Sequence, residues 1–556
     1  MPARTLDVRK WNWTGARRLT VACVLMMFAA ATLHAQAYQD LYNLGCIGAC
    51  SPIDSGRLTQ GIDGNLYGTA EYGGTNNLGA LFYATPGGSS APVFYFDGTK
   101  SGANPVGALT LASTDGNFYG TTSNGGKFGF GTLFRFTPST LKLTVVHHFT
   151  SAEGSPRVAP VEAKDTRLYG TTVSGTIYRV TLPNGPFTIL PNTVPQEPLG
   201  PLFQASDGFL YGTTELGGTD NLGTIFRMAT NGTIKIIHNF TNSALDGSNP
   251  AGPLVQGKDG NLYGTTQHGG AALDDTGTVF KLTLPSLTFS TLFSFDPLNL
   301  DATNVDGAFP FAGLLQGPDG NFYGSASNGG ANTAGTLFKI TTGGVFTKLF
   351  DFGSADANGA LPYTTLMEHT NGVFYGLTSG GGTLSSGEFY SLTLPTVNIH
   401  ISLCCNWWVI LDQPVNILGQ GLSGAIAVNF GSVAAQFQPG SDTFLTAFVP
   451  SGAIDGPVSV TLATGLQIET EQSAHILPKI TNLDPSSGSV GSQVHIVGGG
   501  FAGTKKVTFG GVAATTFSVL TPAMILATVP AGAVTGKVGV VTPNGSASSP
   551  QTFTVQ

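Results

Sequence analysis

The chain has 556 residues, of which only 10% are charged, and it contains 78 glycines, 36 phenylalanines and 15 tyrosines. This composition is typical of strand-rich structure with many turns, and it excludes a disordered chain, which needs high charge and few aromatic residues. The net charge of −8 argues against nucleic acid as the main partner, because such partners need clustered Lys and Arg.

The first 37 residues predict a cleaved signal peptide. Basic residues precede an uncharged stretch, 19–33, and Ala35-Gln36-Ala37 follows it. This stretch is shorter than the roughly 20 residues that a membrane-spanning helix needs, and Ala-x-Ala is typical of a cleavage site. We therefore expect residues 1–37 to be removed and the rest to be secreted or held at the cell surface without spanning a membrane. An uncleaved anchor is the alternative.

Four cysteines follow the predicted signal peptide. Cys46 and Cys50 are separated by three residues in an expected loop, and in an oxidising compartment such a pair is expected to form a disulfide. Cys404 and Cys405 are adjacent, and Cα atoms about 3.8 Å apart are closer than disulfides usually require. Their pairing therefore stays open. Neither pair has histidines at the spacing of a zinc site, so the sequence predicts no metal and no cofactor.

One sequence motif, which we call the repeat phrase, recurs along the chain at intervals of 42 to 60 residues and reads Asp-Gly-Asn-Leu/Phe-Tyr-Gly-Thr-Thr. Its tyrosines are Tyr67, Tyr119, Tyr169, Tyr211, Tyr263, Tyr323 and Tyr375. A repeat of this period with short strands and Gly-rich turns predicts one four-stranded propeller blade per copy. The last copy stops after three strands, whereas an unassigned strand, 38–44, precedes the first. We therefore predict a seven-bladed β-propeller over 38–395, with strand 38–44 closing blade seven and removing an exposed edge.

The fifth copy shows the predicted blade in detail. Strands are expected over 253–256, 261–266, 278–283 and 287–295, and Asp259-Gly260 forms the tight turn after the first of them. We interpret each Asp-Gly pair as a hairpin turn in preference to a metal site. The repeat tyrosine is expected to fill space between blades, and Gly264 to allow another backbone to approach closely.

The wording of the repeat, Tyr-Gly-Thr-Thr followed by Gly-Gly and Gly-Thr-Leu/Val/Ile-Phe, resembles a tandem repeat of exported bacterial proteins that is called the GloVer repeat. The resemblance spans residues 58–394 and departs in the third copy, where 171–176 lacks the Gly-Gly loop. It implies a secreted repeat protein and supplies no catalytic residues.

A different repeat begins near residue 396, with copies offset by 79 or 80 residues. The second copy, 478–556, opens with Pro-Lys-Ile-Thr-Asn-Leu-Asp-Pro-Ser-Ser-Gly and resembles the IPT/TIG domain, which implies an immunoglobulin-like β-sandwich. The first copy, 396–477, is a degenerate version whose opening contains Trp407 and Trp408. These rings alternate along a strand, so one is expected at a domain–domain contact, with a ligand platform as the alternative. Lys505, Lys506 and Lys537 are too sparse for DNA binding.

No catalytic motif stands out, so function is expected where the repeats vary. Loops between second and third strands emerge with the blade-to-blade loops on one propeller face, and such loops collect binding residues. The candidate ligand-binding residues are Tyr72, Lys127, Phe128, Phe130, Glu215, Asp220, His268, Asp274 and Asp275. Their aromatic and carboxylate groups suit an extracellular glycan or protein.

Three functions remain open at this point. The first is an exported binding or adhesion protein with the propeller as recognition head and the sandwich pair as stalk. The second is a lyase or glycan hydrolase that uses the propeller face. The repeat also resembles the Asp-Gly-Asn-Leu-Trp phrase of streptogramin lyase-like propellers, with Tyr in place of Trp and no matching catalytic residue. The third is a structural envelope component.

Overall fold

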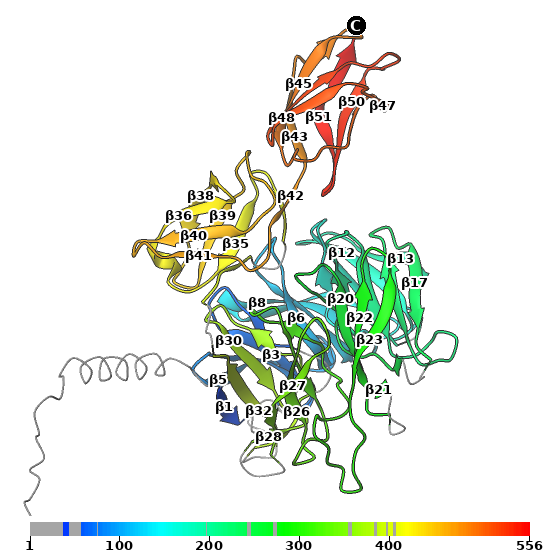
Figure 1. Cartoon of the computed structure of the whole chain (residues 1–556), viewed down its shortest axis with the longest axis vertical. Coiled ribbons are helices and arrows are strands. Elements are labelled where there is room, and N and C mark those ends of the chain that lie inside the picture. The colour runs from blue at the N-terminus through cyan, green and yellow to red at the C-terminus, as the bar shows by residue number, and fades with distance from the viewer. Residues whose placement is uncertain are drawn as a thin grey trace, which may run out of the picture.

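The computed structural model describes residues 37–43, 57–74, 76–195, 197–241, 246–270, 275–353, 358–382, 386–395, 399–403 and 407–556. Within these ranges the regular elements are strands and two short 3₁₀ helices, η1 (Pro138–Thr140) and η2 (Leu422–Gly424). The protein is all-β, with a β-propeller followed by two β-sandwiches (Figure 1). No helix in the described ranges has the length and apolarity needed to cross a membrane.

Within the described residues, seven four-stranded antiparallel sheets, which we call blades, form the propeller. Blades 1 to 4 contain β2 (Thr59–Gln60), β3 (Leu66–Ala70), β4 (Ala80–Ala84), β5 (Ser90–Tyr95); β6 (Ala103–Leu111), β7 (Phe118–Asn124), β8 (Thr132–Thr137), β9 (Lys142–His148); β10 (Val161–Glu162), β11 (Arg167–Thr171), β12 (Thr176–Thr181), β13 (Phe187–Thr193); β14 (Phe203–Gln204), β15 (Leu210–Thr214), β16 (Thr224–Met228), β17 (Ile234–Asn239). Blades 5 to 7 contain β19 (Val255–Gln256), β20 (Leu262–Thr266), β22 (Thr278–Thr283), β23 (Thr288–Ser294); β24 (Leu315–Gln316), β25 (Phe322–Ala326), β26 (Thr336–Ile340), β27 (Phe346–Asp351); β29 (Met367–Glu368), β30 (Val373–Leu377), β32 (Glu388–Thr393), β1 (Ala37–Asn43).

Strand β1 is the outer strand of blade 7, where it pairs antiparallel with β32. It begins at Ala37, the last residue of the predicted signal peptide, whose residues 1–36 lie outside the described part. The ring is closed by side chains as well, because one apolar cluster joins each blade to the next. The cluster between blades 7 and 1 contains Leu58 and Phe82 with Tyr375 and Phe389.

The repeat tyrosines pack between blades, as the sequence predicts. The ring of Tyr67 lies 4.7 Å from that of Phe118 in the next blade, and Tyr263 lies 4.2 Å from Phe322. Their hydroxyls also donate to the aspartate of the preceding turn, as from Tyr263 to Asp259 Oδ2 at 2.7 Å. This bond recurs in the first six blades and explains why aspartate belongs to the phrase without a metal.

The expected role of Gly264 is wrong in one respect. A Cβ atom there would lie 2.5 Å from Phe280 Cζ and 2.9 Å from Leu254 Cδ2. The glycine therefore makes room for the side chains of the neighbouring strands and not for another backbone. The same conflict with a phenylalanine ring occurs at Gly68, Gly120, Gly212 and Gly324.

Because successive strands of a blade are antiparallel, the propeller has two distinct faces. The turns from first to second strands and from third to fourth strands lie on one, which we call the turn face. The loops from second to third strands and the blade connectors lie on the other, the loop face. Two short ladders also lie there, β18 (Gly247–Ser248) with β21 (His268–Gly269) and β28 (Gly359–Ala360) with β31 (Gly380–Gly381).

The first sandwich occupies residues 402–477, apart from the gap at 404–406, and has a core of its own. Its sheets contain β33 (Ser402–Leu403), β35 (Pro414–Leu418), β39 (Phe444–Phe448), β38 (Gln436–Pro439); β37 (Val433–Ala434), β36 (Ala425–Phe430), β40 (Val458–Leu462), β41 (Gln467–Glu469); and the parallel pair β34 (Trp408–Ile410) and β42 (His475–Leu477). The second sandwich contains β43 (Lys479–Asp484), β45 (Gln493–Gly499), β49 (Met524–Thr528), β48 (Phe517–Thr521); β44 (Ser487–Gly488), β51 (Gly545–Val555), β50 (Gly536–Thr542), β46 (Lys506–Phe509) and β47 (Val512–Ala513).

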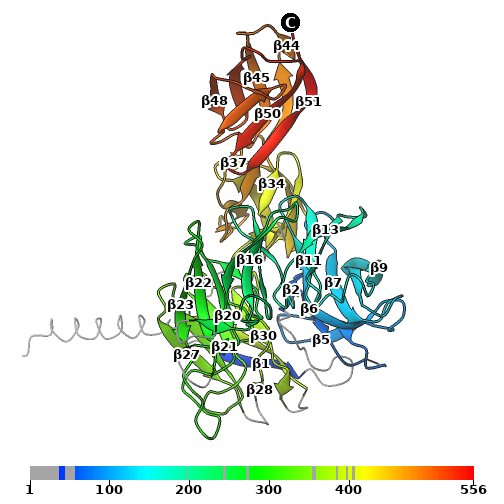
Figure 2. The ribbon, with the colours of Figure 1, turned by 90° about the vertical axis from the view of Figure 1, so that its right-hand side faces the viewer.

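The first sandwich packs on the turn face of the propeller. Thr443 Oγ1 donates to the carbonyl of Ile62 at 2.8 Å, and Gln420 Nε2 donates to Thr370 Oγ1 at 2.9 Å. Ile62 and Thr370 belong to the first turns of blades 1 and 7. Figures 1 and 2 show the sandwich pair on one side of the propeller and the loop-face strands β21 and β28 on the other.

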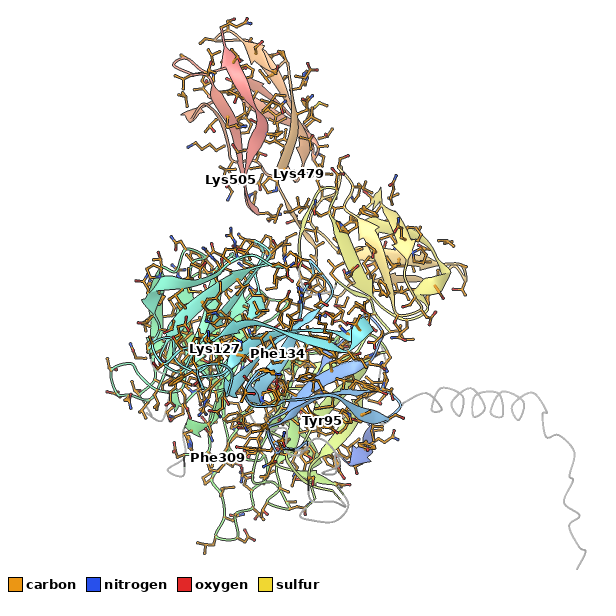
Figure 3. The ribbon with its side chains drawn as sticks, turned by 180° about the vertical axis from the view of Figure 1, so that it is seen from behind. Tyr95, Lys127, Phe134, Phe309, Lys479 and Lys505 are labelled. Carbon is orange, nitrogen blue, oxygen red and sulfur yellow. The ribbon has the colours of Figure 1, made fainter. Side chains whose placement is uncertain are left out.

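The two sandwiches meet end to end. Lys479 Nζ donates to the carbonyl of Leu411 at 3.0 Å, and Asn544 Nδ2 donates to both carboxylate oxygens of Asp455, at 2.7 and 2.9 Å. Figure 3 shows Lys479 and Lys505 at the end of the last sandwich that faces the first. The pair therefore extends away from the propeller as a hydrogen-bonded unit.

Candidate functional site

A set of exposed aromatic side chains, which we call the aromatic cluster, lies on loop-face segments of blades 1 and 2. It consists of Tyr72, Tyr95, Phe128 and Phe130, which are 39%, 39%, 48% and 37% exposed. The ammonium of Lys127 lies 5.1 Å from the centre of the Phe128 ring, within the range of a cation–π contact. Tyr95 and Lys127 are labelled in Figure 3. Four of the predicted binding residues thus lie on these two blades, and Tyr95 joins them from strand β5.

The local sequence explains why these rings are exposed. The backbone of Phe130 forms a bridge with Gly125, and Gly125, Gly126, Gly129 and Gly131 all have positive φ. A chain that turns this often in a few residues has little room to bury its side chains. The backbone N–H of Lys127 donates to His148 Nδ1 at 3.1 Å, which holds this loop against the outer strand β9.

A second group lies at blades 3 to 5 of the same face. Burial and the neighbouring carboxylate of Glu197, with which Glu215 shares a hydrogen bond, raise the pKa of Glu215. The charges of His268 and Arg157 oppose this shift. His268 Nδ1 also lies 3.1 Å from Asp275 Oδ2. A pair of interacting carboxylates with a histidine nearby is the kind of group that moves protons.

The other predicted residues do not join this group. Asp220 is exposed, and Asp274 lies outside the described residues. Cys46, Cys50, Cys404 and Cys405 lie outside them as well.

Strained backbone marks the connectors of the loop face. Among the residues that the structure describes, five that directly precede proline have φ between 54 and 58°, a conformation that costs free energy for any residue with a Cβ atom. They are Asn104, Glu197, Asn249, Phe309 and Leu361. Four of them accept an N–H from a residue just after the second strand of their own blade, as Glu197 does from Glu215 at 2.8 Å. Backbone strain of this kind is common at functional sites. The repeat phrase did not reveal that a strained residue before proline recurs in the connectors.

The turn face holds a group that the sequence did not predict. Glu368, His400 and Glu471 come from blade 7, the linker and the first sandwich, and one ligand atom of each lies within 4.8 Å of the others. Burial and the charge of Glu471 raise the pKa of Glu368 to about 8, although Lys258 opposes the shift. The spacing of 32 and 71 residues matches no metal motif, so only the fold brings these side chains together.

One tryptophan makes the expected domain–domain contact. The ring of Trp408 stacks on His475 of its own sandwich, with centroids 4.5 Å apart, and faces the ammonium of Lys164 in blade 3 at 5.0 Å. Trp407 packs against the core of the first sandwich. The interpretation of one ring as an interdomain contact is therefore confirmed.

Comparison with protein families identifies the repeat. The Gloeobacter/Verrucomicrobia repeat matches residues 27–176 and 172–390, which together are more than half of the chain. The chain belongs to this repeat family. The IPT/TIG domain matches residues 478–555, so the resemblances to the GloVer repeat and to the IPT/TIG domain are confirmed. No curated protein matches the chain.

Several solved structures show distant likenesses. A streptogramin B lyase is 16% identical, covers 65% of this chain and 99% of its own, and has a TM-score of 0.44. Virginiamycin B lyase from Staphylococcus aureus is 15% identical with the same coverage and TM-score. TolB from Acinetobacter baumannii is 16% identical, covers 48% of this chain and 58% of its own, and has a TM-score of 0.30. Likenesses this weak leave the function open.

The third Gloeobacter/Verrucomicrobia repeat unit differs from the others on the loop face. Strands β11 and β12 are joined by a tight turn, in which the N–H of Gly175 donates to the carbonyl of Thr172 at 2.8 Å. A Cβ atom at Gly175 would lie 2.1 Å from the carbonyl oxygen of Val194. Blade 3 therefore presents no long loop between the aromatic cluster on blades 1 and 2 and the Glu197–Glu215 pair.

Proposed function

We propose that this chain is an extracellular binding protein whose loop face recognises a glycan or a protein, while the two sandwiches form the stalk. The observation that carries the proposal is the position of the first sandwich. Its contacts to Ile62 and Thr370 cover the turn face and, in the described part of the chain, leave the loop face uncovered. That face carries the aromatic cluster, the carboxylates and the strained connectors.

The chemistry of the loop face favours a ligand with both apolar and polar surface. Four exposed rings are more than scattered surface residues require, and aromatic side chains are enriched in recognition surfaces. Lys127 adds a positive charge next to Phe128, and the carboxylates across blade 3 add acceptors for hydroxyl or amide groups. Sugars and peptides offer these groups.

The test is an array of glycans and peptides probed with the full chain. Phe128→Ala and Tyr72→Ala should each abolish a specific signal, whereas Leu520→Ala should not, because Leu520 is at least as exposed (50%) but lies on the last sandwich. Signal that survives both loop-face substitutions would place recognition elsewhere and contradict the proposal. The absence of binding to the glycans and to the peptides would favour a structural envelope component.

A second candidate function rests on the Glu197–Glu215 pair. A carboxyl whose pKa is raised by burial and by a neighbouring carboxylate, as that of Glu215 is, can serve as the general acid that a lyase or a glycan hydrolase needs. The enzyme reading predicts that the full chain degrades a polysaccharide that it binds. Glu215→Gln should then abolish product formation but keep binding, and binding without any turnover would exclude it.

A further inference from the structure

Seven residues at the same position of the innermost strands form a ring on the turn face, which we call the inner ring. Each pairs with the residue before the repeat tyrosine, as Gln256 does with Leu262. The members are Gln60, Leu111, Glu162, Gln204, Gln256, Gln316 and Glu368. Five of them use a side-chain oxygen to accept the N–H of the residue two positions after the ring member of the preceding blade. In blade 6, for example, Gln316 Oε1 accepts from the N–H of Lys258 at 2.8 Å.

Blade 7 breaks this pattern. The residue that should donate to Glu368 is Pro318, which has no N–H. The side chain of Glu368 is only 9% exposed, and its Oε1 atom is buried without a hydrogen-bond partner among the described residues. A buried carboxylate oxygen without a partner costs free energy. Glu368, the inner-ring residue without an N–H donor, is thus one of the two inner-ring residues that carry a carboxylate.

The orphaned carboxylate faces two further ligand groups. His400 Nδ1 lies 3.9 Å from Glu368 Oε1, and the side chain of His400 is 9% exposed as well. Glu471 contributes a second carboxylate, whose Oε1 is also buried without a hydrogen-bond partner in the described part of the chain. The backbone N–H of His400 donates to the backbone carbonyl of Thr370, two residues from Glu368, at 3.2 Å, which holds the His400 backbone next to the inner ring.

We propose that Glu368, His400 and Glu471 bind one Zn²⁺ ion at the junction between the propeller and the first sandwich. One imidazole and two carboxylates form a donor set that suits Zn²⁺, whereas Ca²⁺ takes six to eight oxygen ligands. Ligands about 2.1 Å from a tetrahedral Zn²⁺ lie about 3.4 Å from one another. The three atoms, all within 4.8 Å of one another, reach that spacing through small rotations about side-chain bonds.

Lys258 is the competing cation. Its ammonium lies 3.6 Å from Glu471 Oε2, the oxygen that is not orphaned, so Glu471 can keep this ion pair and offer Oε1 to the metal. A groove of about 650 Å³ reaches Lys258, Pro318 and Glu471 from the surface. It gives the ion a path to the site and leaves room for a water molecule as the fourth ligand.

The three ligands belong to three separate parts of the chain, so the ion would hold those parts together. Metal binding would tie blade 7 and the linker to the sandwich. Removal of the ion would leave two carboxylates facing each other beside the two hydrogen bonds from Thr443 and Gln420. The site therefore sets how firmly the sandwich is held on the propeller.

The test measures Zn²⁺ binding to the full chain at neutral to slightly alkaline pH by titration calorimetry, after dialysis against a chelator. We expect one Zn²⁺ per chain and much weaker binding of Ca²⁺. Glu471→Gln and Glu368→Gln should each weaken Zn²⁺ binding by about 100-fold or more, beyond the roughly 10–100-fold typical of residues that only orient a ligand. Glu368→Gln is expected to fold, because glutamine occupies this ring position in blades 1, 4, 5 and 6.

Two matched controls separate this site from other histidines and carboxylates. Glu469→Gln removes an exposed carboxylate two residues from Glu471, and His495→Gln removes a histidine of the last sandwich. Both should bind Zn²⁺ like the unaltered chain. Co²⁺ added in place of Zn²⁺ should give visible absorption that His400→Gln abolishes. The proposal is overturned if Zn²⁺ does not bind, if Ca²⁺ binds as tightly, or if the ligand variants keep their affinity.

Discussion

Glu162 is the inner-ring carboxylate that still accepts hydrogen bonds from the preceding blade. Its role can be tested through the pH dependence of the protein's stability. Its oxygens accept the N–H of Ser113 at 2.7 Å and the hydroxyl of Ser113 at 2.8 Å. Burial, opposed by these bonds but assisted by the charges of Asp115 and Asp165, raises the pKa of Glu162 to about 7 from its usual 4.5. The fold therefore favours the protonated carboxyl.

The sign of the effect follows from where the protons bind. Between pH 4.5 and about 7 the folded chain holds a proton on Glu162 that the unfolded chain has lost, so stability falls as the pH rises through this window. A shift of about 2.5 pKa units corresponds to about 3 kcal/mol. For a domain of roughly 350 residues, whose unfolding entropy is about 2.1 cal/mol/K per residue, that is a change of about 4 °C in melting temperature.

Glu162→Gln replaces the carboxyl with the amide found in four other blades. We expect the variant to melt with the unaltered chain at about pH 4.5 and about 4 °C above it at about pH 8.5, measured by thermal unfolding at both values. Other carboxylates titrate in both proteins, so they cancel in the difference. Gln204→Glu, the reverse change in the next blade, should lower the melting temperature only at the higher pH. Parallel pH profiles for all three proteins would refute the reasoning.

Three further predictions use other parts of the molecule. Gly264→Ala forces a Cβ atom to 2.5 Å from the Phe280 ring and should lower the free energy of unfolding by about 1–3 kcal/mol, whereas Gly424→Ala, with open space around it, should be nearly neutral in the same denaturant titration. Thr443→Val removes a hydrogen bond to the propeller and should broaden the distance distribution from small-angle X-ray scattering; an unchanged distribution would mean that the junction does not depend on it. Pro318→Ala supplies the missing N–H to Glu368 and should weaken Zn²⁺ binding several-fold. An unchanged Zn²⁺ affinity would show that the missing N–H donor to Glu368 does not contribute to metal binding.

The repeat phrase contains most of the sequence information that specifies the propeller fold. Strand β22 has the predicted bounds, Thr278–Thr283, because its alternation is unambiguous between two glycine turns. The first strand of that blade is shorter than the predicted 253–256, and only Val255–Gln256 pair. Pro253 has no N–H to give to a ladder. His268, expected in a loop, lies in the short strand β21, since pairing of two residues leaves no periodic pattern.

The loop-face candidates could be predicted as a set but not as an arrangement. Variation between repeat copies identifies Tyr72, Phe128 and Glu215, because these positions are not needed to build a blade. Which of them meet depends on the connectors. The partner of Glu215 is Glu197, a residue from a connector that aligns with no part of the repeat phrase.

The turn-face group shows that differences between repeat copies contain a signal that the shared phrase does not. Beside the residues that all copies have in common, Pro318 and Glu368 are ordinary variation. The fold connects the two substitutions, because Pro318 lacks the N–H that Glu368, the inner-ring residue of blade 7, would otherwise accept. An altered donor and an altered acceptor in adjoining blades form a coupled departure from symmetry. Such a pair, unlike a single substitution, becomes visible when the copies are aligned with one another, and it points to the place where a third group must satisfy the carboxylate.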